Sequence, residues 1–148
     1  MVADRIEVET EAAPFELDLL VVHPHMQADA ITRELGLSPT FAWTKGDART
    51  DAAGRASVPR SRTAWRHTFV RRSTDVGLTI DDVLGLLAAH RAFFRRVCAE
   101  GGTSDLVLRF PGSRYFGFNF SARTLETVAR CNLQFGLEVF PDWDPGQA

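Results

Sequence analysis

Apolar and polar residues alternate in several short stretches of this chain, and such alternation predicts β-strands with one buried face. The first stretch, FELDLLVVHP, places Phe15, Leu17, Leu19 and Val21 on one face. It becomes apolar on both faces towards its end, as in a strand inside a sheet. We therefore predict a central strand over residues 15–22.

A short helix is predicted next, over the stretch ADAITRELG. Ile31 and Leu35 are four residues apart and share one helical face, while Asp29 falls in the first turn, where the helix dipole favours an anion. Gly36 occupies the C-terminal cap position, and Pro39 follows where a helix cannot continue. The helix is therefore expected to end at Gly36.

Two further predicted strands flank a long polar segment. FAWTK alternates, with Phe41 and Trp43 expected to point inward, and this strand ends at Gly46. TAWRHTFV alternates again, with Trp65 and His67 on one face. We expect the two strands to pair, and the two tryptophans to stack across the pair inside the core.

The most regular pattern is helical and covers the stretch IDDVLGLLAAHRAFFRRVCA. Thr79 is expected to cap it, with Asp82 in the third position of a capping box. Its apolar residues recur at helical spacing and form one stripe, comprising Ile80, Val83, Leu84, Leu87, Phe94, Val97 and Cys98. An uninterrupted helix of this length would span about 30 Å.

The C-terminal third predicts a hairpin, a helix and a strand. After Gly101 and Gly102 end the long helix, DLVLRF and YFGFNF flank the tight turn PGSR. Ser121 caps ARTLETVARCN, and LQFGLEVF alternates as the last strand. The order β-α-β-β-α-β-β-α-β predicts an α+β fold: a mainly antiparallel sheet with helices on one face, ferredoxin-like with an added β-α-β tail.

The chain has the length of one domain. Its 148 residues are 45% hydrophobic and 24% charged, which is typical of a globular protein. We predict a single α+β domain over residues 1–148, with an acidic N-terminal extension at 1–13 and a C-terminal tail at 142–148. Residues 48–62 are predicted to form a mobile loop, because they contain one large apolar residue in a long polar run.

Charge is spread unevenly, although the formal net charge is only −2. Residues 1–18 are acidic, whereas residues 45–72 hold seven arginines and Lys45, the only lysine. The N-terminus lacks the pattern of a signal peptide and no apolar run is long enough to span a bilayer, so we expect a cytoplasmic protein that does not contact membranes. Cys98 and Cys131 lack metal or redox spacing and are expected to be reduced and mostly buried.

A family resemblance is carried by three short motifs: Leu35-Gly36-Leu37 with Pro39, Lys45-Gly46-Asp47, and Trp65. With these motifs in their order, the chain resembles a bacterial family known as domain of unknown function 4279, over residues 15–141. The long segment before Trp65 and the close of the match at Phe140-Pro141 depart from the family pattern. The family has no assigned activity, so the resemblance implies a domain and no particular function.

Common catalytic signatures are absent from the sequence: it has no nucleophile elbow, phosphate-binding glycine loop, dinucleotide-binding turn or zinc-protease helix. His23 and His25 flank a proline, and a metal would need a further ligand such as His67. We expect no metal and no cofactor, with His23 closing the first strand. His90 lies on the apolar stripe of the long helix and is interpreted as a boundary residue bonded to backbone.

Lys45 and Asp47 flank Gly46 where the second strand leaves the sheet, and two interpretations of this motif stay open. They could brace a turn through backbone hydrogen bonds. Alternatively, Lys45, Asp47, Trp65 and Arg66 could bound a polar pocket at the strand end, with the loop as a lid.

The arginine cluster extends from Arg49 to Arg72 and includes Arg60 and Arg62. A nucleic-acid role is disfavoured, because the pI is about 6.1 and the loop has no aromatic residues between its arginines. We expect Arg60 and Arg62 to make salt-sensitive contacts with an acidic protein surface.

The function expected from the sequence is therefore a non-catalytic module that binds another protein, by analogy with small toxin-neutralising immunity domains. The alternative is a small-molecule or nucleotide-binding enzyme subunit that uses Lys45 and Asp47. The sequence does not determine the oligomeric state.

Overall fold

The computed structural model describes residues 15–73, 76–112 and 118–140. One layer is a five-stranded sheet with strand order β2-β5-β1-β6-β7. Its strands are β1 (Phe15–His23), β2 (Phe41–Trp43), β5 (Thr63–Ser73), β6 (Thr103–Pro111) and β7 (Gln134–Phe140). All neighbouring strands are antiparallel except β6 and β7, which run parallel. The predicted α+β class with a mainly antiparallel sheet is confirmed.

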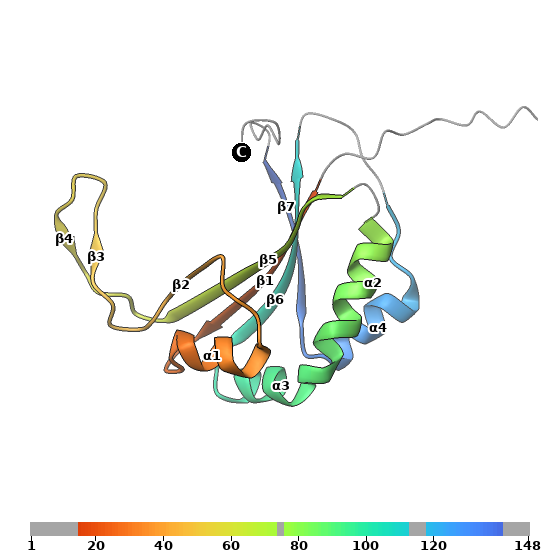
Figure 1. Ribbon diagram of the computed structural model, residues 1–148, viewed down its shortest axis with the longest axis horizontal. Coiled ribbons are helices and arrows are strands. Elements are labelled where there is room, and N and C mark those ends of the chain that lie inside the picture. The colour runs from red at the N-terminus through yellow and green to blue at the C-terminus, as the bar shows by residue number, and fades with distance from the viewer. Residues whose placement is uncertain (1–14, 74–75, 113–117, 141–148) are drawn as a thin grey trace, which may run out of the picture.

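The second layer is helical and covers one face of the sheet, as Figure 1 shows. It consists of α1 (Ala28–Leu35), α2 (Val76–Leu87), α3 (Arg91–Ala99) and α4 (Ala122–Arg130). Strands β2 and β5 lie on one side of β1, and β6 and β7 lie on the other. The first strand of the chain is therefore the central strand of the sheet. No helix of the described residues covers the opposite face (Figure 1), and we call it the helix-free face.

Strand β1 is central because its sequence is suited to burial. Phe15, Leu17, Leu19 and Val21 have no exposed surface and pack against the helices, as their alternation predicts. They join one continuous core with apolar residues of every helix in the second layer. Its largest fully buried members are Trp65, Phe15, Phe94, Phe110, Leu17, Leu19, Ile31, Ile80, Leu84, Leu87, Leu106 and Leu108.

Helix α1 ends as its sequence predicts but begins with help from a distant residue. Gly36 has a φ of 65°, and its N–H donates to the carbonyl of Thr32. At the other end, the Ala28 N–H donates to the hydroxyl of Thr44, 3.1 Å away. Gln27, at the N-cap position, supplies no side-chain hydrogen bond, so the Thr44 hydroxyl takes the place of a cap. This contact also links the start of the helix to the residue that follows β2.

The predicted orientation of β2 is wrong. Ala42 lies opposite Trp65 and Trp43 lies opposite Ala64, so the two tryptophans are on different faces of the sheet. Trp65 is fully buried under the helices, whereas Trp43 is half-buried on the helix-free face. Alternation shows which residues of a strand share a face, but not which of the two faces meets the core. A shift of one residue in the pairing with the neighbouring strand moves every side chain to the opposite face.

The predicted long helix is interrupted. It begins at Val76 rather than at a Thr79 cap, and a 3₁₀ turn over Ala88–His90 separates α2 from α3. The apolar stripe is buried as predicted except for Cys98, which is exposed, while Cys131 is buried. The break allows α2 and α3 to follow different directions over the twisted sheet (Figure 1).

The structure adds detail to one predicted connecting segment and corrects another. Residues 48–62 contain a short hairpin, β3 (Arg49–Thr50) paired with β4 (Ala56–Ser57), which projects from the end of the sheet (Figure 1). Strand β6 pairs with β1 on one side and with β7 on the other. Of its predicted partner YFGFNF, residues 118–120 are not in a strand, and 115–117 lie outside the described residues. The hairpin matters for function, because it carries Arg49 and Arg55 of the arginine cluster and Arg60 follows at its base.

Candidate functional site

The motif Thr44-Lys45-Gly46-Asp47 forms a tight turn at the base of the hairpin. The Asp47 N–H donates to the Thr44 carbonyl at 3.0 Å, and Gly46 has a φ of 89°, which favours glycine. The Asp47 carboxylate in turn accepts the Thr44 N–H at 2.7 Å. Asp47 thus braces the turn with its side chain, and the motif has a local structural explanation.

The same turn closes the base of the hairpin. The Gly46 N–H donates to the Arg60 carbonyl at 2.8 Å, and the Arg60 N–H donates to the Asp47 carbonyl at 3.0 Å. The Lys45 N–H donates to the hydroxyl of Thr63 at 2.9 Å. These bonds join the two ends of residues 46–60, so the hairpin rises from a fixed base.

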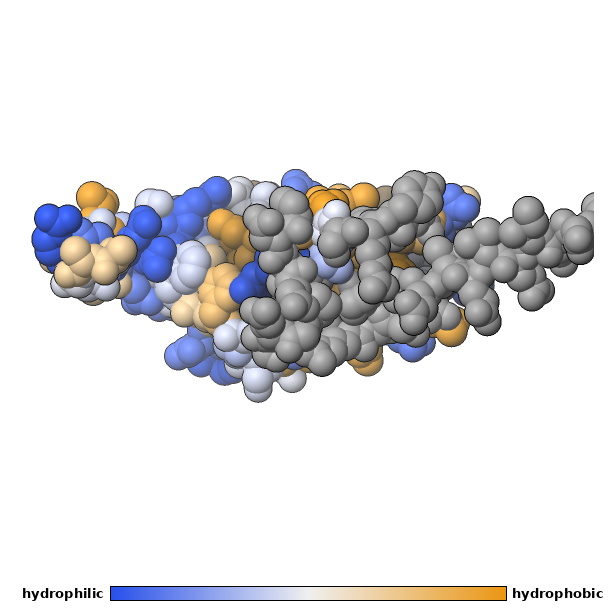
Figure 2. All heavy atoms as spheres, turned by 90° about the horizontal axis from the view of Figure 1, so that it is seen from above, coloured by the Kyte–Doolittle hydropathy of each residue, from blue (hydrophilic) through white to orange (hydrophobic). Residues whose placement is uncertain are grey.

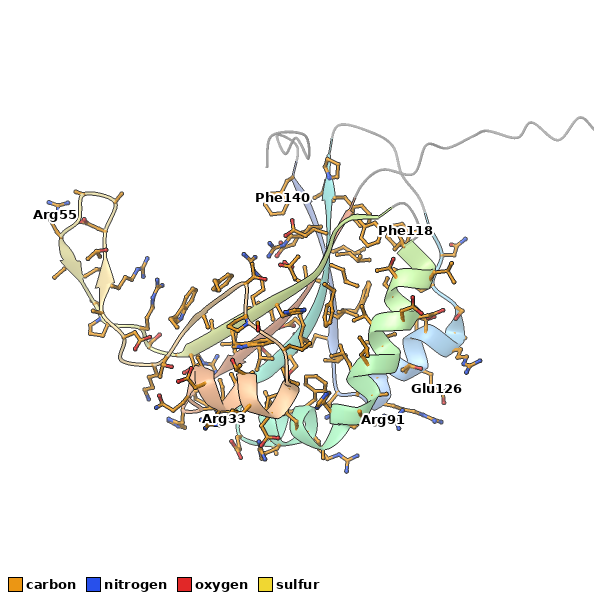
Figure 3. The ribbon with its side chains drawn as sticks, viewed as in Figure 1. Arg33, Arg55, Arg91, Phe118, Glu126 and Phe140 are labelled. Carbon is orange, nitrogen blue, oxygen red and sulfur yellow. The ribbon has the colours of Figure 1, made fainter. Side chains whose placement is uncertain are left out.

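The hairpin is held together at its tip by Asp51. Its carboxylate accepts N–H groups of Ala53 and Arg55 and pairs with the Arg55 side chain at 2.9 Å. The hydrogen bond from the Arg55 N–H is the main reason that the pKa of Asp51 lies below its ordinary value. Figure 3 shows Arg55 on the projecting hairpin, away from Arg33 and Arg91 in the helical layer.

A concavity of about 360 Å³ lies between the hairpin base and the helix-free face. Its lining includes Arg49 from β3, Arg60 and Arg62 from the segment entering β5, Trp43 from β2, and the apolar side chain of Val58. Val58 is 79% exposed. Figure 2 shows that hydrophilic residues predominate on the hairpin itself.

Arg60 and Arg62 are held in place from outside the hairpin. The Arg60 guanidinium lies 4.0 Å from the centre of the Trp43 ring, a cation–π contact. The Arg62 guanidinium donates to the Gly101 carbonyl at 2.7 Å, across the end of β1. Both side chains are therefore oriented before any ligand binds.

From the concavity, a column of aromatic rings and charges crosses the helix-free face. Trp43 stacks on Phe41 with ring centres 5.1 Å apart, and the Arg66 guanidinium lies 4.2 Å from the Phe41 ring. Arg66 and Arg109 both face Asp18, at 3.6 and 3.1 Å, and Arg109 also pairs with Glu138 at 2.9 Å. We call Arg66, Asp18, Arg109 and Glu138 the charge row.

The charge row was missed by sequence reasoning, although a signal was present. Asp18 stands between Leu17 and Leu19 in the central strand, and Arg109 stands between Leu108 and Phe110 in β6. A carboxylate is almost never fully buried unless it is paired, and Asp18 has no exposed surface. Its presence in a central strand thus predicts buried cationic partners, but only the pairing of β1 with β5 and β6 identifies them.

The structure brings some of the predicted site residues together and separates others. Lys45 and Asp47 lie at the hairpin base near Arg60 and Arg62, as the bonds above show. The Lys45 amine is exposed and lies 3.4 Å from Nδ1 of His25.

Trp65 and Arg66 do not join Lys45 and Asp47 at the hairpin base, and their side chains lie on opposite faces of the sheet. Trp65 lies in the core, where its indole N–H donates to the Thr32 hydroxyl at 2.9 Å. Arg66 lies on the helix-free face in the charge row. Adjacent residues of one strand point to opposite faces, so a single pocket does not include both.

The histidines make local contacts. Nδ1 of His23 accepts the N–H groups of His25 and Met26 at 3.0 and 2.8 Å, and its Nε2 lies 3.0 Å from the Glu100 carboxylate. Burial lowers the pKa of His23, and the Glu100 carboxylate opposes this effect. His67 contacts the Ser38 carbonyl through Nδ1. Within the described residues, no three His, Cys, Asp or Glu side chains gather as a metal would require.

The geometry of the described residues defines a two-layer α+β protein, with helices on one face of the sheet and a basic concavity at its edge. The chain belongs to the family Domain of unknown function (DUF4279), whose model matches residues 13–140. No curated protein and no solved structure matched the chain. Among the described residues, none of the helices has the length and apolar character that a bilayer crossing requires.

Proposed function

We propose that the protein is a non-catalytic module of the bacterial cytoplasm, built on a ferredoxin-like sheet, that binds another protein through the β3–β4 hairpin and the basic concavity beside it. The observation that carries this proposal is the convergence of Arg49, Arg60 and Arg62 with exposed Val58 around one concavity. Exposed apolar surface bordered by oriented arginines is the composition of a protein-recognition surface.

Binding is favoured over catalysis by the state of the acidic groups near the concavity. Asp47 accepts a backbone N–H, Asp51 pairs with Arg55, and Glu100 faces His23. Each carboxylate is engaged in holding the structure, so none of these three is placed to act as a general base on a ligand in the concavity. The comparison with toxin-neutralising immunity domains enters only as an analogy for a small module of this kind.

Site-specific photo-crosslinking in the organism that produces the protein tests the proposal. A photo-reactive amino acid replaces Val58 in one variant and Leu86, an exposed residue of α2, in the control. We expect a discrete protein adduct from position 58 that is lost when Arg60 and Arg62 are changed to serine, and no such adduct from position 86. Adducts of equal yield from both positions, or none that depends on the arginines, would contradict the proposal.

A further inference from the structure

We propose that the basic concavity receives an acidic peptide segment of the partner, with carboxylates on its arginines and a large apolar side chain between them. This inference rests on the proposed function and specifies the chemistry of the partner. The pairing of the arginines, their orientation and the apolar lining of the concavity support it.

The arginines of the concavity converge without a carboxylate partner, whereas the other arginines without such a partner in the described residues, Arg33, Arg91, Arg95 and Arg123, lie in the helices. Carboxylates lie within ion-pair distance of Arg55, Arg66, Arg96, Arg109 and Arg130. In the described part of the chain, Arg49, Arg60 and Arg62 have no such carboxylate, although all three line one concavity. Like charges that converge without counter-charges repel one another, and an anion from a partner removes that repulsion.

Orientation favours a carboxylate as that anion. A guanidinium carries five N–H donors in a planar fork that matches a carboxylate in a bidentate arrangement. Arg62 directs one nitrogen to the Gly101 carbonyl, and the Arg60 guanidinium lies over the Trp43 ring. Each therefore retains donors while its position is fixed, which reduces the entropy lost when a partner binds.

The apolar lining and its surroundings select a peptide rather than a nucleic acid. Val22, Val58 and Trp43 lie among the arginines, so a bound segment needs apolar surface as well as charge. Arg60 covers one face of the Trp43 ring and Phe41 stacks on it too, which leaves little room for a stacked base.

Titrations of the isotope-labelled protein with capped synthetic peptides, followed by NMR, test this inference. The probe is a short peptide of Asp and Glu residues around a central Leu-Phe pair. The comparison peptides keep Leu-Phe with Asn and Gln in place of the acids, or keep the acids with Gly-Ser in place of Leu-Phe. We expect the first peptide to bind most tightly and to shift the indole N–H resonance of Trp43 but not that of buried Trp65.

Matched arginine variants assign the binding to the concavity. Arg60→Gln and Arg62→Gln should each weaken binding of the acidic Leu-Phe peptide about tenfold, the loss expected for a charge-assisted hydrogen bond. Arg49→Gln should also weaken it, and the exposed side chain of Arg49 makes no described bond whose loss could unfold the chain. Arg33→Gln and Arg91→Gln remove equal charge from exposed helical positions and should leave the affinity unchanged.

Several outcomes would overturn the inference. These are equal binding of the acid-free peptide, an equal loss in the Arg33 or Arg91 controls, no binding of the acidic peptide, and tighter binding of a short single-stranded DNA that the same variants abolish. If the peptides fail but arginine-dependent protein adducts form from position 58, only this inference is wrong. If the acidic peptide binds as expected but no adduct forms in cells, the inference about the site holds and the proposed function is wrong.

Discussion

Replacing Asp18 with asparagine should lower the free energy of unfolding by about 2–3 kcal/mol. The side chain has no exposed surface, and its carboxylate faces the guanidinium groups of Arg109 and Arg66 at 3.1 and 3.6 Å. Asparagine keeps the shape but removes the charge, so two guanidinium groups then face each other without the anion between them.

The magnitude follows from the exposure of the partners. Removing one member of a fully buried ion pair costs about 3–5 kcal/mol, because the remaining charge is left without compensation. Here Arg66 and Arg109 are 22% and 19% exposed, so water recovers part of the loss. Arg109 also keeps Glu138, and Arg66 keeps the Phe41 ring. Because of these contacts, we expect a loss of unfolding free energy at or below the lower end of the range for a fully buried pair.

Urea unfolding followed by far-ultraviolet circular dichroism measures the effect, with Asp29→Asn as the control. Asp29 is exposed in the first turn of α1, and its loss should cost about 0.3–1 kcal/mol through the helix dipole. The double variant with Arg109→Gln should show a coupling of about 1 kcal/mol or more. If Asp18→Asn stays within about 0.5 kcal/mol of the unchanged protein, the charge row does not stabilise the sheet and the argument is refuted.

Three further predictions test other parts of the fold. Burial holds the pKa of His23 below its ordinary value, so the unfolded chain binds the proton at a higher pH than the folded chain, and the stability should be full above about pH 6.5 and fall as the pH drops below it. The free energy of unfolding measured across this pH range should depend less on pH in His23→Asn. An equal dependence in the variant would argue against the prediction. Trp65→Ala should lower the free energy of unfolding by about 3–5 kcal/mol and Trp43→Ala by about 1–2 kcal/mol, since only Trp65 is fully buried. Equal losses of stability in chemical denaturation would contradict the sheet faces assigned to the two residues. Gly102→Ala should destabilise by about 1–3 kcal/mol, because an added Cβ would lie 2.7 Å from a backbone oxygen of β1. Gly85→Ala, with nothing within 4 Å in α2, should stabilise by up to about 1 kcal/mol, and thermal melts that rank the two variants in the opposite order would refute this.

Local chemistry made much of the fold predictable from the sequence. The alternation from Phe15 to Val21 determined a buried strand face, Gly36 determined where α1 ends, and Ser121 determined where α4 begins, with its hydroxyl accepting the Thr124 N–H. Each of these signals depends on residues close together in the chain, where the backbone geometry is already known.

Signals that depend on pairing between distant segments were decided by the tertiary structure. The face of β2 depends on its register with β5, and this register puts Trp43 beside the concavity instead of in the core. Asp18 meets Arg66 and Arg109 only because β5 and β6 flank β1. The sequence predicted Arg60 and Arg62 as contact residues from charge alone, but their orientation comes from a ring on another strand and from the Gly101 carbonyl between α3 and β6. Side chains far apart in sequence are brought together by strand order and register, which local patterns constrain only weakly.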